Sequence, residues 1–106
     1  MSGIIMGNIR GIGDIVVTVD PANVAANSTS EQTFSVPGLL PGDKVYAHKA
    51  TYDAGLAVVN ARVSAQDTLA LTFMNCTGAG IDAPSQLITL MIFRPEVLGN
   101  TQFPAL

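Results

Sequence analysis

The strand–turn–strand pattern of residues 55–75 constrains the fold of this chain more than any other feature. In the segment GLAVVNARVSAQDTLALTFMN, apolar side chains occupy alternate positions on both sides of a polar link at 65–67. These positions are Val59, Ala61, Val63, Leu69, Leu71 and Phe73. An alternation of period two is typical of a strand with one buried face. We therefore predict a β-hairpin whose six alternating side chains face the protein core.

Further strand-length segments are separated by glycine, proline and other turn residues. β-Branched residues predict a strand at 14–20, and further strands are predicted at 31–38, 44–50 and 86–94. No segment has a convincing helical period. Short strands at intervals of about 12 residues predict an all-β protein, either an antiparallel β-sandwich or a jelly-roll-like barrel. The connections are too short for crossover helices, which argues against an α/β fold.

Two local features refine this prediction. The dipeptide Pro41-Gly42 matches the two central positions of a type II turn. The segment 86–94 is apolar on both faces, as shown by Ile88, Leu90 and Ile92 on one side and Leu87, Met91 and Phe93 on the other. Such a strand is either central in its sheet or covered by a neighbour.

The chain has 106 residues, which fits one domain. We divide it into an extended N-terminal arm (1–13), a β-sandwich domain (14–94) and an extended C-terminal arm (95–106). Both arms carry apolar side chains, namely Ile4, Ile5, Met6, Ile9, Val97, Leu98, Phe103 and Leu106. Because the ends of a monomer are normally frayed, we predict that these residues bind a neighbouring subunit. The alternative is that the C-terminal arm packs back on its own sandwich and covers 86–94.

Charge is scarce in this sequence. Charged residues make up 12% of the chain, against about 25% in an average soluble domain. The five basic residues and the net charge of −3 argue against binding to nucleic acid, which requires clustered cations. Either much of the surface contacts other protein, or threonine, serine, asparagine and glutamine keep it soluble. No secretion signal and no apolar stretch of about 20 residues is evident, so we expect synthesis in the cytoplasm and no membrane span.

Candidate catalytic residues are few. Cys76 is the only cysteine and His48 the only histidine, so a cysteine–histidine hydrolase is a minor alternative. A single thiol also excludes a disulfide within the chain and leaves no zinc-binding spacing. The glycines at 7, 11 and 13 precede a β-branched strand, whereas a dinucleotide-binding motif precedes a helix. The sequence therefore predicts no enzyme and no cofactor.

Ligand-binding patterns are equally weak. The aspartates lie mainly at predicted turns and strand ends, without the spacing of a calcium-binding loop, so we predict no metal site from sequence. A calcium ion held by distant turns stays an alternative. Tyr46 and Tyr52 are candidates for a platform that stacks against a sugar ring.

Several motifs resemble one group of known proteins. They are the link DPANVAANS, the turn FSVPGLLPGD and the hairpin sequence AGLAVVNARVSAQDTL, followed by TFMNCT. Together with the segments between them, they resemble small β-sandwich virion proteins of tailed bacteriophages, of the head-decoration, cement or head-fibre type. The resemblance extends over about residues 14–94 and leaves out both arms.

This resemblance implies a structural role without catalysis. It implies a head decoration or cement protein that is synthesised in the host cytoplasm and stabilises the lattice at the capsid surface. The implied partners are the major capsid protein and further copies of the chain, with a homotrimer among the candidate assemblies. The alternative is a receptor- or carbohydrate-binding module of a phage fibre or tail.

Overall fold

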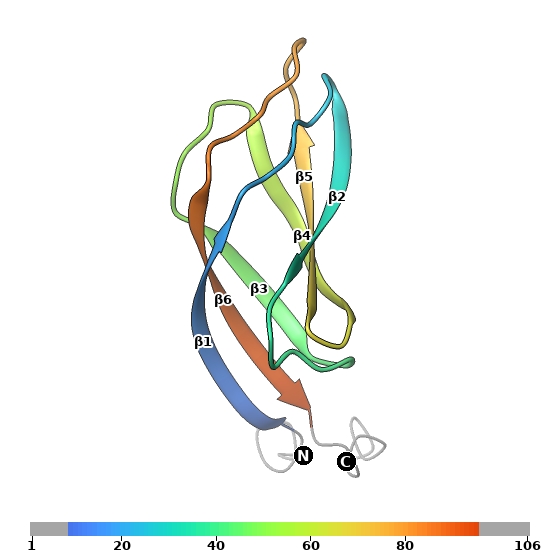
Figure 1. Ribbon diagram of the computed structural model, residues 1–106, viewed down its shortest axis with the longest axis vertical. Coiled ribbons are helices and arrows are strands. Elements are labelled where there is room, and N and C mark those ends of the chain that lie inside the picture. Colours follow the sequence, from blue (N-terminus) through green and yellow to red (C-terminus); the bar gives the residue numbers. More distant parts are fainter. Residues whose placement is uncertain (1–8, 96–106) are drawn as a thin grey trace, which may run out of the picture.

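The computed structural model describes residues 9–95 as six β-strands in two antiparallel three-stranded sheets (Figure 1). The strands are β1 (Ile9–Val19), β2 (Ser28–Ser35), β3 (Lys44–Lys49), β4 (Leu56–Ala65), β5 (Thr68–Asn75) and β6 (Gln86–Pro95). One sheet has the order β1-β6-β3 and the other the order β2-β5-β4. The prediction of an all-β antiparallel fold is confirmed. Over the described range there is no helix with the length and apolar character needed to cross a membrane.

The strand boundaries differ from the prediction mainly in β1 and β2, and β6 also includes Pro95, which the prediction placed in the C-terminal arm. β1 begins at Ile9, so residues 9–13, which we had placed in the N-terminal arm, pair with β6. β2 begins at Ser28 and ends at Ser35, whereas the prediction for this strand was 31–38. Its first residues are serine and threonine, which give no apolar alternation in the sequence. They form a strand because the exposed edge of β5 provides the backbone partners.

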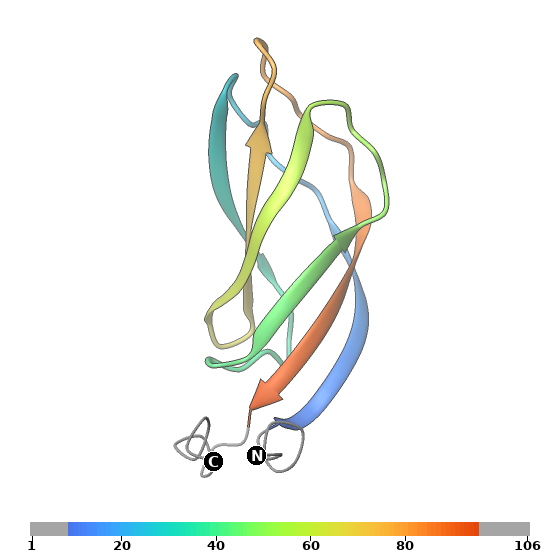
Figure 2. The same ribbon diagram turned by 180° about the vertical axis from the view of Figure 1, so that it is seen from behind.

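The core lies between the two sheets. It is formed by the inward side chains of both central strands, chiefly Leu69, Leu71 and Phe73 of β5 and Ile88 and Leu90 of β6, all fully buried. Of the two alternatives that the sequence left open for 86–94, the structure shows the central strand, because β6 pairs with β1 on one side and with β3 on the other. Figure 2 shows these three strands side by side from the back of the molecule.

Five of the six predicted core residues of the hairpin are confirmed, and Val59 is the exception. Its side chain is 51% exposed, whereas Val58 packs against the core. The pairing of β4 with β5 shifts between Val58 and Asn60, which is a β-bulge. A bulge adds one residue to the strand and reverses the alternation beyond it. Ala61 and Val63 follow the bulge and point inward as predicted.

The predicted type II turn is present at the start of β3. The amide of Asp43 donates to the carbonyl of Leu40 at 3.0 Å, and Gly42 has a φ of 96°. Positive φ at this position is the reason for glycine. The turn delivers the Asp43 carboxylate into the interior, where its side chain is only 1% exposed.

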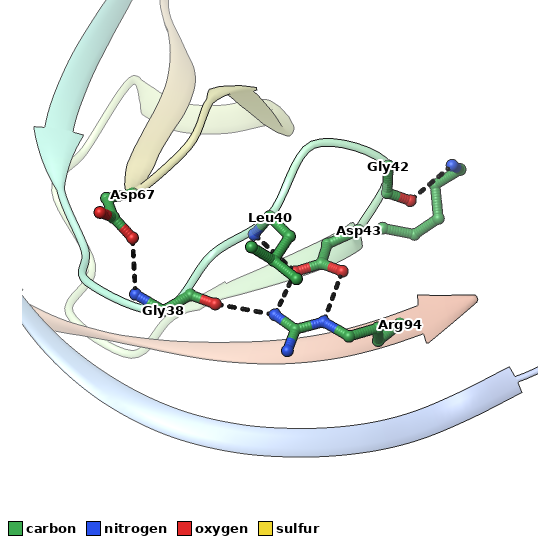
Figure 3. A network of polar contacts seen from close by, with 7 residues as sticks. Gly38, Leu40, Gly42, Asp43, Asp67 and Arg94 are labelled. Carbon is green, nitrogen blue, oxygen red and sulfur yellow. Dashed lines mark hydrogen bonds and ion pairs between the residues drawn. The ribbon is translucent and has the colours of Figure 1, made fainter. Parts of the chain in front are cut away.

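A polar network around Asp43 ties three parts of the chain together at one end of the sandwich (Figure 3). The Arg94 side chain of β6 donates to both carboxylate oxygens of Asp43, from Nε at 2.9 Å and from Nη2 at 2.7 Å. Nη2 also donates to the carbonyl of Gly38 at 2.7 Å. The amide of Gly38 in turn donates to the carboxylate of Asp67, in the β4–β5 turn of the other sheet. The network therefore links the two sheets through the 36–43 loop.

Candidate interaction surface

The outward face of the β1-β6-β3 sheet carries a group of apolar side chains. The register places Ile12 opposite Phe93 and Val16 opposite Thr89, and β3 places Tyr46 opposite Met91. Directly opposed residues of an antiparallel pair project to the same side of the sheet. We call this surface the apolar face and define it by Ile12, Val16, Tyr46, Leu87, Met91 and Phe93.

These apolar side chains are open to solvent. Ile12, Val16, Tyr46 and Leu87 are each 56–64% exposed, and Met91 is 36% exposed. Exposed large apolar side chains gathered on one face of a sheet are a common mark of an interaction site, although Thr18, Thr89 and His48 also belong to this face. The apolar face is therefore the leading candidate for a functional surface on the described part of the chain.

The outward face of the other sheet is polar and provides a contrast within the same molecule. Its central strand presents Thr68, Ala70, Thr72 and Met74, and its edge strands add Thr29, Glu31, Thr33, Asn60 and Arg62. Arg62 and Glu31 form a two-point ion pair at 2.8 Å. Because they belong to the two strands that flank β5, their side chains meet across that strand. Ala70 is consequently buried although it belongs to the outward face.

The charged residues of the apolar face lie at its two margins. Asp14 projects from β1, on the same row as Met91 and Tyr46. Lys44 projects from β3, on the same row as Phe93 and Ile12. One acidic side chain on β1 and one basic side chain on β3 thus flank the central strand β6, which presents no charge on this face. Each charge is exposed, so its contribution to folding is small.

Two grooves adjoin the β1-β6-β3 sheet, the first beside the apolar face and the second mainly on the inward side of the sheet. One, of about 320 Å³, runs along the β3–β4 connection and includes Tyr46, His48, Lys49 and Tyr52 in its lining. Both tyrosines that we singled out from the sequence thus lie beside one groove. Lys49 donates to Asp53 at 2.7 Å in the same wall.

The second groove, also of about 320 Å³, is lined by Arg10, Gly11, Ile12, Gly13, Ile92 and Arg94. A Cβ atom at Gly11 or Gly13 would meet no atom within 4 Å. The two glycines therefore leave part of this groove open. They are not required by close packing within the described chain.

Of the residues that we predicted to bind a partner, only Ile9 belongs to the described range. It begins β1, opposite Pro95, and is 44% exposed. The others lie outside the described residues, namely Ile4, Ile5, Met6, Val97, Leu98, Phe103 and Leu106. The sequence shows that 86–94 is apolar on both sides, but it does not show that Ile12, Val16 and Tyr46 belong to the same surface. Only the pairing of β1 and β3 with β6 could have revealed them.

The structure does not join the two candidate catalytic side chains by a hydrogen bond. His48 lies on β3, opposite Thr89 of β6. Cys76 is exposed and directly follows β5 of the other sheet, where its amide donates to the carbonyl of Gly55 at 3.0 Å. Within residues 9–95, no group of three or more histidine, cysteine, aspartate or glutamate side chains is arranged to hold a metal ion.

We expect Cys76→Ser to leave folding and partner binding unchanged. The thiol is exposed and the backbone contact to Gly55 does not depend on the side chain. Circular dichroism would measure folding, and co-sedimentation with the purified partner would measure binding. A variant that folds normally but no longer binds would support a chemical role for this thiol.

Comparison of the chain with known protein families, with curated proteins and with solved structures gives no match.

Proposed function

We propose that this chain is a non-enzymatic structural protein of a phage virion, of the decoration or cement type, which binds the capsid lattice and other copies of itself. The observation that carries the proposal is the exposed apolar face on a chain with few charges. A protein that works by covering other subunits needs a stiff scaffold and an apolar contact surface, and it needs no reactive group.

The sequence motifs supply the virion part of the proposal. They resemble small β-sandwich proteins of tailed phages over most of the described range. The polar network around Asp43 supports the role of a stiff scaffold, because it ties the end of β6 to the 36–43 loop and to the opposite sheet. Binding to such a scaffold costs little conformational entropy.

A carbohydrate- or receptor-binding module of a fibre or tail is the second candidate. The observation that favours it is the groove beside Tyr46 and Tyr52, because exposed aromatic rings can stack on sugar rings. Tyr52 is 86% exposed, so its ring is available to a ligand. The groove is lined by both tyrosines and by the Lys49–Asp53 pair.

Copy number per virion separates the two candidates. Purified virions of the encoding phage would be separated by gel electrophoresis, and the band of this chain would be quantified against the major capsid protein. A decoration protein is expected at hundreds of copies per particle, in a simple ratio to the capsid subunit. A dozen copies or fewer would favour the fibre or tail role, and complete absence from virions would overturn both.

A further inference from the structure

We infer that the apolar face is a twofold interface between two copies of this chain, packed sheet against sheet. This inference goes beyond the proposed function, because it specifies which surface self-associates and with which symmetry. It rests on the extent of the face, on its charge pattern and on its contrast with the opposite sheet.

The area of the face meets the requirement of a specific contact. Two strands of 11 and 10 residues and one of six, at about 3.3 Å per residue and a spacing of about 4.8 Å, form a footprint of roughly 430 Å². Projecting side chains enlarge the accessible area, so two such faces bury about 1,000 Å² in total. This value is at the lower limit for specific interfaces, a size typical of weak or transient contacts.

The charge pattern selects the orientation. A twofold axis parallel to the strands places β1 of one copy over β3 of its partner. The acidic margin at Asp14 then faces the basic margin at Lys44, which lies one row further along the strands. A twofold axis perpendicular to the strands would instead place β1 of one copy over β1 of its partner. The two Asp14 carboxylates would then lie along the same edge of the interface and repel each other. Complementary margins thus favour the parallel axis.

The uncharged centre suits contact with an identical surface. In a twofold contact the same patch lies on both sides, so it must be complementary to itself. Ile12, Val16, Leu87 and Met91 satisfy this condition because apolar side chains pack against each other without polar partners. Packing of sheets about 10 Å apart is the arrangement already present inside each sandwich.

Leu87→Glu is the direct test, and Met74→Glu is its matched control. Both residues are exposed and apolar and lie on the outward face of a central strand, Leu87 on β6 and Met74 on β5. Sedimentation velocity over about two decades of concentration in the micromolar range would give the dimer Kd of each protein. We expect Leu87→Glu to raise Kd by about 30-fold or more and Met74→Glu to leave it unchanged.

A charge reversal tests the orientation independently of the apolar contacts. Asp14→Lys and Lys44→Glu should each raise Kd by about 2- to 5-fold, and the double variant should restore it. Circular dichroism verifies the fold of every variant. A wild-type chain that stays monomeric throughout, or a folded Leu87→Glu variant that dimerises as the wild type does, would overturn the inference. Failure of the chain to appear in virions would overturn the proposed function alone, because dimerisation is measured on the purified protein.

Discussion

Phe73→Ala is expected to lower the free energy of unfolding by about 3–5 kcal/mol. Phe73 lies on β5, the central strand of its sheet, and its side chain is completely buried. It belongs to the same cluster as Leu71, Ile88 and Leu90, so the deleted ring leaves a cavity between the two sheets. Urea unfolding followed by circular dichroism would measure the loss as a lower midpoint.

Val59→Ala is the matched control for this prediction. Val59 occupies an equivalent position in the sequence pattern but is half exposed behind the β4 bulge. Its replacement should change the free energy of unfolding by less than about 0.5 kcal/mol. Equal losses for the two variants would contradict the placement of the bulge, and an unchanged midpoint for Phe73→Ala would contradict the placement of the core.

The local pattern of the sequence was enough to predict most of the strands. Alternation along 55–75 identified Leu69, Leu71 and Phe73 as core residues, and the two-faced composition of 86–94 predicted a strand that is either central or covered, of which the central position is observed. These predictions succeed because a strand exposes alternate residues to opposite sides, whatever its partners are. The bulge at Val59 escaped prediction because it depends on pairing with β5, which the sequence of β4 alone does not encode.

Polar residues inside the sandwich were not predicted. Asn75 continues the inward row of Phe73 and is 1% exposed. Its amide donates to the carbonyls of Val24 and Ala79, and its side-chain oxygen accepts from the amide and hydroxyl of Thr77. A buried amide is tolerated only where such partners converge. The partner Val24 is 51 residues away in the sequence, which is why no local pattern reveals it.

The candidate surface depends on long-range pairing in the same way. Ile12, Val16 and Tyr46 are ordinary strand residues in the sequence, separated by turns and polar connections. Only the order β1-β6-β3 places them beside Leu87 and Met91. The scarcity of charge left open a surface that contacts other protein, but the sequence did not show which face carries the apolar side chains.

Asp43→Asn is expected to lower the free energy of unfolding by about 2–3 kcal/mol near neutral pH. The asparagine has nearly the same shape, but it cannot supply two anionic oxygens to the Arg94 guanidinium. The cation would keep its bond to the Gly38 carbonyl and could gain only one neutral acceptor, the asparagine side-chain oxygen, in place of the two-point ion pair. The expected loss is smaller than the 3–5 kcal/mol typical of fully buried pairs, because the Arg94 side chain is 28% exposed and water can reach it.

The same variant should change how stability depends on pH. Hydrogen bonds from Arg94 hold the pKa of Asp43 below its ordinary value of 3.8, against the opposing effect of burial. An acid whose pKa is lower in the folded state stabilises the fold above its unfolded pKa, and this contribution disappears as the pH falls through the folded pKa. Urea midpoints measured from pH 7 downward should therefore fall less steeply for Asp43→Asn than for the wild type at pH values below about 4.

Glu31→Gln is the control for this pH effect. The pKa of Glu31 is also lowered, chiefly by its hydrogen bonds with Arg62, but this ion pair lies on the solvent-exposed face of the other sheet. Water and salt screen such a pair. Its removal should therefore leave the fall of the urea midpoint below about pH 4 nearly unchanged. The opposite result would be a less steep fall of the urea midpoint in Glu31→Gln and an unchanged fall in Asp43→Asn. In that case the loss of stability in acid would arise at the exposed Glu31–Arg62 pair, and not in the network around Asp43.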